Sequence, residues 1–169
     1  MNDIARLFVG IELSDRARDK ISGILPALRE GVEGKFHGKS MYHITLCFLG
    51  QVQRSDIPAI CALIDAIPLP TFALSLGEWG TFKDGKILYL GISEPCETLR
   101  AIQHQLAHAL IDAGYLSEVA PYVPHITVAR GVKRVESLPE APTAEWTAHK
   151  LTLFESARID ERLQYLPIH

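Results

Sequence analysis

Two histidines in this sequence are each followed, two positions later, by a threonine: His43 by Thr45, and His125 by Thr127. An imidazole has an ordinary pKa of about 6.5, so at neutral pH one histidine can accept a proton from an attacking water while the other donates a proton to a leaving oxygen. Threonine hydroxyls donate hydrogen bonds without adding charge, which suits phosphate oxygens held between two imidazoles. Arg130, three residues beyond Thr127, adds a permanent positive charge with planar donors that match phosphate. The set is typical of phosphoester chemistry.

Other catalytic patterns are missing from the sequence. It has no Gly-rich loop ending in Lys-Ser or Lys-Thr, no H-E-x-x-H and no G-x-S-x-G. His104 and His108 have the four-residue spacing of a helical metal pair, but no further ligand follows at a known spacing. The pair also shares a helix face with Arg100 and Asp112, so we interpret it as part of a solvated face. The sequence therefore predicts a reaction without a metal ion or another cofactor.

Both histidine–threonine pairs lie in short runs rich in β-branched and aromatic residues, YHITLCFLG at residues 42–50 and PHITVAR at residues 124–130. Such runs are typical of strands. Side chains alternate between the two faces of a strand, so each histidine shares a polar face with its threonine. The opposite face of the first run is expected to pack in the core through Tyr42, Ile44, Leu46 and Phe48. In the second run Ile126 and Val128 are expected to do the same.

The rest of the sequence predicts three helices and five more strands. The helices are expected after Ser14 and Ser55, which are suitable N-caps, and around Pro95, which suits a first turn. The third helix has a buried stripe and a C-terminal glycine, formed by Leu99, Ile102, Leu106, Leu110, Ala113 and Gly114. The other strands are expected at residues 6–13, 71–79, 86–93, 149–158 and 162–169, with a hairpin turn at Asp84-Gly85. The segments interpreted as loops are residues 30–40 and 137–146.

This order mixes helices and strands without regular βαβ alternation, which favours an α+β fold with largely antiparallel sheets. His43 and His125 are 82 positions apart, near half the length of the 169-residue chain. That spacing predicts an internal duplication with two pseudo-symmetric lobes, each made of one half of the sequence and each presenting one H-x-T-x strand. If the lobes face each other, both polar faces line a central cleft. We expect residues 1–169 to form a single bilobal phosphoesterase domain.

The composition is that of an ordinary soluble globular protein, with 47% hydrophobic and 22% charged residues. The net charge of −3 argues against a general duplex-binding surface, so any contact with nucleic acid must be local. Three cysteines without close spacing favour a reducing compartment over a disulfide framework or a zinc site. We expect no signal peptide and no membrane span. These features predict a cytoplasmic monomer.

The motifs HITL at residues 43–46 and HITV at residues 125–128 resemble the paired H-x-T-x motifs of the two-histidine phosphoesterase superfamily. The opening RLFVGIEL, the extension HITLCFLG, and PHITVAR with its final Arg130 resemble one branch in particular. That branch is the RNA 2′,3′-cyclic phosphodiesterase family, also called 2′-5′ RNA ligase. The resemblance covers essentially the whole chain in motif order, spacing and length.

The resemblance implies a two-lobed α+β fold with a central cleft and no required metal. It implies opening of a 2′,3′-cyclic phosphate, at an RNA 3′ end or on a small cyclic nucleotide, to leave a 2′-phosphate. By this resemblance His43 is the proton donor to the departing 3′ oxygen, and His125 is the proton acceptor that activates water. The phosphate-binding residues that it implies are Thr45, Thr127 and Arg130.

Three alternatives stay open at this point. The same chemistry can act on another cyclic nucleotide or on a 2′-5′ linkage, including 2′-5′ ligation, because the sequence does not define the loops that select a substrate, residues 30–40 and 116–124. The third alternative is a non-catalytic binder of RNA ends, although the presence of both histidines argues against it. Base stacking and core packing are both compatible with Trp79, Phe82 and Tyr122. No role is assigned to His37, His149 and His169.

Overall fold

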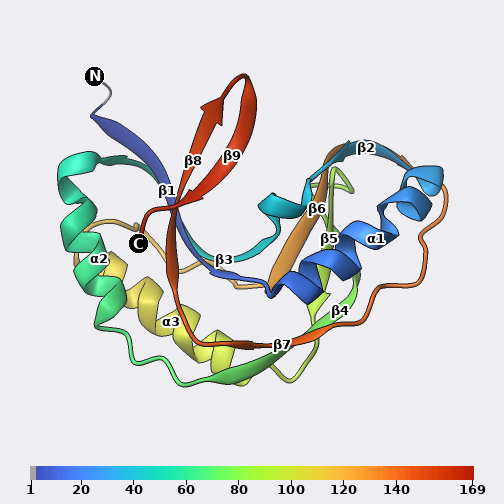
Figure 1. Cartoon of the computed structure of the whole chain (residues 1–169). Coiled ribbons are helices and arrows are strands. Elements are labelled where there is room, and N and C mark those ends of the chain that lie inside the picture. Colours follow the sequence, from blue (N-terminus) through green and yellow to red (C-terminus); the bar gives the residue numbers. More distant parts are fainter. Residues whose placement is uncertain (1–2) are drawn as a thin grey trace.

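The computed structural model describes residues 3–169 (Figure 1). The strands are β1 (Ile4–Glu12), β2 (Val32–Phe36), β3 (His43–Gln53), β4 (Phe72–Phe82), β5 (Ile87–Ile92), β6 (His125–Val135), β7 (Glu145–Ala148), β8 (Thr152–Ile159) and β9 (Arg162–Pro167). The helices are α1 (Asp15–Gly31), α2 (Ile57–Asp65) and α3 (Glu97–Asp112), with short 3₁₀ turns η1 (Lys39–Met41) and η2 (Arg54–Asp56). Each strand expected from the sequence is present, close to its expected bounds.

The strands form two antiparallel sheets, one in the order β3-β1-β8-β9 and the other in the order β2-β6-β5-β4-β7. The expected α+β class with antiparallel sheets is therefore confirmed. The two histidine strands belong to different sheets, and β3 contacts β6 where the sheets meet. Figure 1 shows α2 and α3 beside the first sheet and α1 beside the second.

The two lobes do not correspond to the two halves of the sequence, as the duplication had suggested. The first sheet joins β1 and β3 to β8 and β9 from the end of the chain, and the second joins β2 and β4 to strands from the second half. The chain leaves the first sheet at β1, runs through α1, and enters the second sheet at β2 before it returns at β3. Each lobe is therefore built from interleaved segments.

Two strands, β2 and β7, lie in segments that the sequence pattern assigned to loops. Both are at the outer edges of the five-stranded sheet. β2 has the sequence VEGKF, with a glycine at its centre, and β7 alternates between exposed and buried residues over only four positions, so neither pattern is long enough to predict a strand on its own. An edge strand pairs with only one neighbouring strand and depends on it for its stability. This explains why the local sequence pattern did not predict β2 and β7.

The three helices begin and end near the expected positions, with local differences. Ser14 caps α1, because its hydroxyl accepts a hydrogen bond from the backbone N–H of Ala17. The helix passes through Pro26 and reaches Gly31, since one face is buried along its whole length through Ala17, Ile21, Leu25 and Leu28. Ser55 does not cap α2. It lies in η2, and Asp56 occupies the N-cap position.

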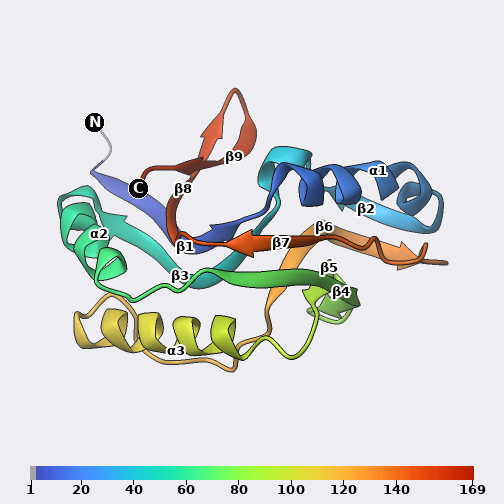
Figure 2. The same cartoon turned by 60° about the horizontal axis from the view of Figure 1, so that its bottom comes forward.

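Helix α3 packs beneath β3 of the first sheet (Figure 2). Pro95 precedes the helix instead of lying in its first turn. The expected stripe from Leu99 to Leu110 is buried, but Ala113 is exposed because the helix has already ended at Asp112. Gly114 has a φ of 87°, which confirms it as the C-terminal glycine.

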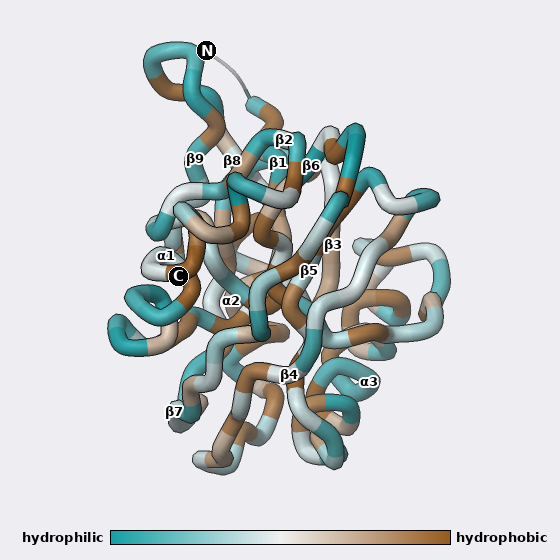
Figure 3. The backbone as a smooth tube through the Cα atoms, turned by 90° about the vertical axis from the view of Figure 1, so that its right-hand side faces the viewer, coloured by the Kyte–Doolittle hydropathy of each residue, from teal (hydrophilic) through white to brown (hydrophobic). Residues whose placement is uncertain are grey.

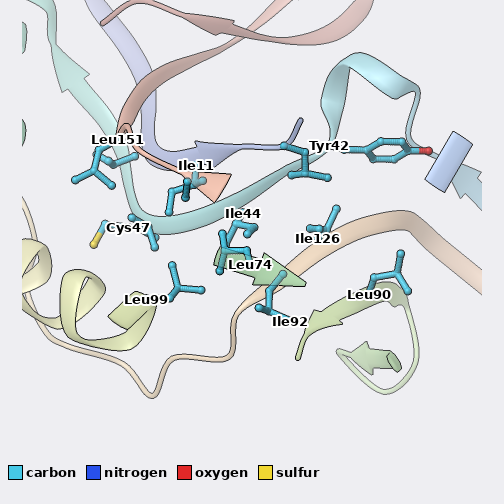
Figure 4. Close-up of a cluster of buried hydrophobic side chains, with 14 of the residues drawn as sticks. Ile11, Tyr42, Ile44, Cys47, Leu74, Leu90, Ile92, Leu99, Ile126 and Leu151 are labelled. Atoms are coloured by element: carbon cyan, nitrogen blue, oxygen red, sulfur yellow. The ribbon is translucent and has the colours of Figure 1, made fainter. Parts of the chain in front are cut away.

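One hydrophobic cluster fills the space behind both histidine strands. Ile44 from β3 and Ile126 from β6 are fully buried in it, as the alternation predicted. Figure 4 shows these two side chains together with Leu74, Leu90 and Leu99 from β4, β5 and α3. Figure 3 shows hydrophobic residues along inner strands such as β5. The shared core holds the two histidine strands in a fixed relation to each other.

Candidate active site

A cavity of about 510 Å³ lies between the two sheets. It is lined by Arg6, Phe8, His37, His43, Thr45, Phe48, His125, Thr127, Arg130, Ser156, Ala157, Arg158, Leu163 and Tyr165. All five residues that the sequence singled out are among them. His43 and Thr45 come from β3, and His125, Thr127 and Arg130 come from β6.

A β-bulge decides which way Arg130 points. In a regular strand Arg130 would lie on the opposite face from Thr127, because it is three positions further along the strand. The pairing of β6 with β5 skips one residue, since Thr127 pairs with Tyr89 while Ala129 pairs with Leu88. The skipped residue shifts the alternation, as a bulge does. Ala129 is buried as a result, and Arg130 lines the cavity beside Thr127.

The equivalent bulge in β3 corrects one expectation. Thr45 pairs with Gly10 of β1, but the next pair is Cys47 with Val9, so Leu46 is skipped. Cys47 is buried in consequence, and Phe48 lies on the cavity face with 51% of its surface exposed. The expectation that Phe48 packs in the core was therefore wrong.

Backbone carbonyls fix the same tautomer in both histidines. Nδ1 of His43 lies 2.8 Å from the Met41 carbonyl oxygen, and Nδ1 of His125 lies 2.8 Å from the Val123 carbonyl oxygen. A carbonyl only accepts, so Nδ1 of each ring carries the proton and Nε2 is left for chemistry. Nε2 of His43 accepts a hydrogen bond of 2.8 Å from the Thr45 hydroxyl. The two strands thus present their imidazoles by one repeated arrangement.

Burial lowers the pKa of both histidines. The pKa of His43 falls to about 4, mainly through desolvation, with the Met41 carbonyl acting in the opposite direction. The pKa of His125 is also lowered by burial, and the charge of Arg130 adds to that effect. Both rings are therefore neutral at pH 7 when no anion is bound. Either can then accept a proton, while a proton donor needs a bound negative charge that favours its cationic form.

Aromatic rings pack against both imidazoles and explain much of this burial. The ring of His43 lies 4.6 Å from Phe8 and 5.0 Å from Tyr165, measured between centroids. The ring of His125 lies 4.7 Å from Phe82, which meets it edge-on. These contacts restrict both imidazoles to one orientation.

The sequence left base stacking and core packing open for Trp79, Phe82 and Tyr122. All three have structural contacts, and none of them lines the cavity. Phe82 packs on His125. The Tyr122 hydroxyl donates a hydrogen bond of 2.9 Å to the backbone carbonyl of Thr45. The Trp79 indole donates to the carbonyl of Pro139 at 2.8 Å. Core packing is the better interpretation for all three, and Tyr122 also holds the first motif in place.

His37, to which the sequence gave no role, is a third imidazole on the cavity. It is only 7% exposed, and its backbone N–H donates to the Val128 carbonyl at 2.8 Å. Its pKa is lowered to about 4, mainly by burial and also by the charge of Arg130, while a hydrogen bond to the Thr127 backbone acts in the opposite direction. Its Nδ1 is buried without a hydrogen-bond partner. No local pattern could have identified His37, because its contacts come from the pairing of the missed strand β2 with β6.

The C-terminal hairpin supplies further cavity residues that sequence reasoning missed. Ser156 and Arg158 from β8, and Leu163 and Tyr165 from β9, form one side of the cavity. Burial raises the pKa of Tyr165, while the guanidinium of Arg130 beside it acts in the opposite direction. Both strands were expected from the sequence, but the pairing of β8 with β1 that brings them to the site was not.

His104 and His108 lie on the exposed face of α3, as expected, with 3.0 Å between their Nε2 atoms. Within residues 3–169, no three or more His, Cys, Asp and Glu side chains are grouped so that they could hold a metal ion. Over the same residues, no helix has the length and apolar character needed to cross a membrane.

A family model described as the 2′-5′ RNA ligase superfamily matches residues 16–160. The chain belongs to this superfamily. Similar members include the RNA 2′,3′-cyclic phosphodiesterase of Escherichia coli, 26% identical over 99% of this chain and 96% of that protein. The protein of the same name from Archaeoglobus fulgidus is 30% identical over 76% of this chain and 73% of its own length. The resemblance of the chain to the RNA 2′,3′-cyclic phosphodiesterase family is thereby confirmed.

Solved structures show the same fold. The E. coli LigT structure in apo form has a TM-score of 0.86 at 25% identity, and covers 99% of this chain and 96% of its own. The E. coli LigT structure complexed with 3′-AMP has a TM-score of 0.84. The MHV ns2 PDE domain, at 14% identity and a TM-score of 0.61, shares the fold. The two-sheet architecture around the cavity is therefore that of the superfamily.

Proposed function

We propose that this protein hydrolyses the 2′,3′-cyclic phosphate at RNA 3′ ends and leaves a 2′-phosphate. One observation carries the proposal: two imidazoles, one from each sheet, line the same cavity in the same tautomer, with Arg130 beside them. This is the arrangement that a two-histidine acid–base reaction at phosphorus needs. The curated relatives named RNA 2′,3′-cyclic phosphodiesterase support the choice of substrate.

Each residue has a defined part in the proposed reaction. Nε2 of His125 accepts a proton from water as the water oxygen bonds to phosphorus. The bond from phosphorus to the 3′ oxygen breaks, and Nε2 of His43 donates its proton to that oxygen. Thr45, Thr127 and Arg130 hold the remaining phosphate oxygens, and Arg130 balances their negative charge. One water is consumed, and the two histidines end with their protonation states exchanged.

The low pKa of His43 makes its role as donor depend on the substrate. In the site without ligand His43 is neutral at pH 7. A cyclic phosphate is an anion, and an anion close to an imidazole favours the protonated form and raises its pKa. Substrate binding thus favours the protonated form of His43 in the complex, where His43 must donate a proton. The Thr45 hydroxyl, which now bonds Nε2 of His43, becomes free to turn toward the phosphate when Nε2 carries a proton.

The distribution of charge and the origin of the catalytic groups support a site for a single RNA end that is formed within one chain. The protein carries a net charge of −3, while Arg6, Arg130 and Arg158 all line the cavity. Binding is therefore directed at a terminal phosphate and not along a duplex. A single chain supplies every proposed catalytic group, which fits a monomer. Cys47, Cys61 and Cys96 are free thiols, which fits a reducing, cytoplasmic compartment.

The proposal is tested with an oligonucleotide that ends in a 2′,3′-cyclic phosphate. The protein should convert it to a product that has gained one water, and both His43→Ala and His125→Ala should abolish most of this turnover. Tight binding of the oligonucleotide without conversion would instead support a non-catalytic binder of RNA ends. Conversion of small cyclic nucleotides but not of the oligonucleotide would place the activity on the smaller substrate.

A further inference from the structure

His37 lies where the backbone of the second histidine strand is irregular. It is the first residue after β2, and the pairing of β2 with β6 matches Phe36 with Ala129. On the other side of β6, the pairing with β5 skips Val128. The backbone N–H of His37 donates to the carbonyl of this skipped residue at 2.8 Å. His37 therefore lies against the bulge that turns Arg130 into the cavity.

The imidazole of His37 holds the residue just before the bulge. Its hydrogen bond with the Thr127 backbone acts to raise its pKa, so the acceptor is the Thr127 carbonyl oxygen, since an acceptor favours the protonated ring. Nδ1 is buried without a partner, which leaves Nε2 as the donor. The backbone and the ring of His37 together thus bind two consecutive carbonyls of β6, those of Val128 and Thr127.

The backbone of His37 is itself fixed by the residue that precedes the first histidine strand. The hydroxyl of Tyr42, which is fully buried, donates to the His37 carbonyl at 3.1 Å. His43 follows Tyr42 directly in the chain. His37 therefore connects the two motifs, with its carbonyl bound beside His43 and its N–H and ring bound to the strand that carries Thr127.

We infer that His37 is a positioning residue for the phosphate site, because it fixes the bulge of β6 and thereby the Thr127 hydroxyl and the Arg130 guanidinium. A bulge disrupts the ladder locally and leaves its extra residue unpaired, so contacts from another segment decide its conformation. Reactivity falls steeply when groups that hold a substrate are displaced by about 1 Å. This inference rests on the proposed function, in which Thr127 and Arg130 hold the phosphate oxygens.

The ring of His37 supplies one neutral donor and takes no part in proton transfer itself. Nε2 is bound to the Thr127 carbonyl, and Nδ1 is shielded from solvent. The charge of Arg130 and that of a protonated His43 both oppose a positive His37, and the nearest ring edge is that of uncharged Tyr165, 6.4 Å away between centroids. An uncharged side chain with one N–H donor should therefore be able to replace the imidazole.

The test compares His37→Gln, which keeps an N–H donor, with His37→Leu, which has similar bulk and no donor. His37→Leu should lower kcat/KM for an oligonucleotide with a 2′,3′-cyclic phosphate end by about tenfold, whereas His37→Gln should stay within about threefold of the unmodified protein. The affinity for inorganic phosphate, measured by calorimetry, should change in the same order. The matched control is His149→Leu, at an exposed position outside the cavity, which should change neither quantity.

A urea melt of each variant separates positioning from stability. A His37→Leu protein that melts at lower urea but keeps the kcat/KM and phosphate affinity of the unmodified protein would overturn the inference. Equal losses in His37→Gln and His37→Leu would also overturn it, because the donor would then be irrelevant. His37→Met, which likewise has no donor, takes the place of His37→Leu if that variant does not fold cooperatively.

The phosphate affinity also keeps this inference distinguishable from the proposed function. If the unmodified protein did not hydrolyse the oligonucleotide, the proposed function would be wrong. A phosphate affinity that is lower in His37→Leu and retained in His37→Gln would still support the positioning role. An affinity that is the same in all three proteins, or no phosphate binding by the unmodified protein, would overturn it.

Discussion

His37 and His43 should make the protein markedly less stable in mild acid. His37 is buried and His43 is half-buried, and the loss of solvation gives both imidazoles a pKa of about 4 in the folded protein, against about 6.5 in an unfolded chain. Between these two values the unfolded state binds protons that the folded state does not. The stability that these groups contribute is therefore present above about pH 6.5 and is lost as the pH falls toward 4.

The size of this effect follows from the two pKa values. Lowering the pH from about 7.5 to about 5 should cost roughly 2 kcal/mol of unfolding free energy for each histidine. A total of roughly 4 kcal/mol is a large share of the 5–15 kcal/mol that is typical of a folded domain. The two contributions add fully only if the groups titrate independently, and the charge interaction between these histidines couples them.

Urea denaturation at the two pH values measures this loss. His37→Gln replaces the ring by an uncharged side chain that can still donate to the Thr127 backbone, and it should remove roughly 2 kcal/mol of the pH-dependent loss. The matched control is His149→Gln, which makes the same replacement at an exposed position. Its loss should equal that of the unmodified protein. An equal loss in His37→Gln and in the unmodified protein would refute the argument that His37 is buried in its neutral form.

Three further predictions concern catalysis. His43→Ala and His125→Ala should each lower kcat by roughly 10²–10⁴-fold while folding stays cooperative, as a single-turnover assay and a urea melt would show. Activity should survive EDTA, and a loss that one divalent ion restores would contradict the proposed metal-free chemistry. The profile of kcat/KM against pH should be bell-shaped with its maximum below about pH 6.5, because burial lowers the pKa of both histidines. The profile of kcat should lie at higher pH, because the bound anion favours the charged forms of the histidines. His125→Ala should flatten the acidic limb and His43→Ala the alkaline limb, whereas a flat profile in the unmodified protein, with chemistry rate-limiting, would exclude an acid–base pair.

The sequence predicted residues that line the cavity where they belong to a repeated local motif. The two H-x-T-x strands, their apolar backs and the α+β class follow from residue types and alternation alone. Arg130 was chosen for its charge, but simple alternation would have pointed it away from Thr127. The bulge that turns Arg130 into the cavity also turns Phe48 there, and a run such as ITLCF gives no local sign of it.

Features set by contacts between distant segments could not be predicted in this way. β2 and β7 are short edge strands whose stability depends on their neighbours. His37 becomes a cavity residue only because the chain next to it pairs with β6. The lobes are interleaved because β8 pairs with β1 from the opposite end of the chain. Each of these depends on which strands pair, and strand partners are not encoded in the periodicity of either strand.

The position of the phosphate in the product tests the central claim most directly. An oligonucleotide with a 2′,3′-cyclic phosphate end is incubated with the protein in isotopically labelled water, and the product is examined by mass spectrometry and phosphorus NMR. The account predicts a 2′-phosphate that carries one labelled oxygen, formed by the unmodified protein and lost when both His43 and His125 are replaced by alanine. A 3′-phosphate product, or the same turnover without the two histidines, would contradict it.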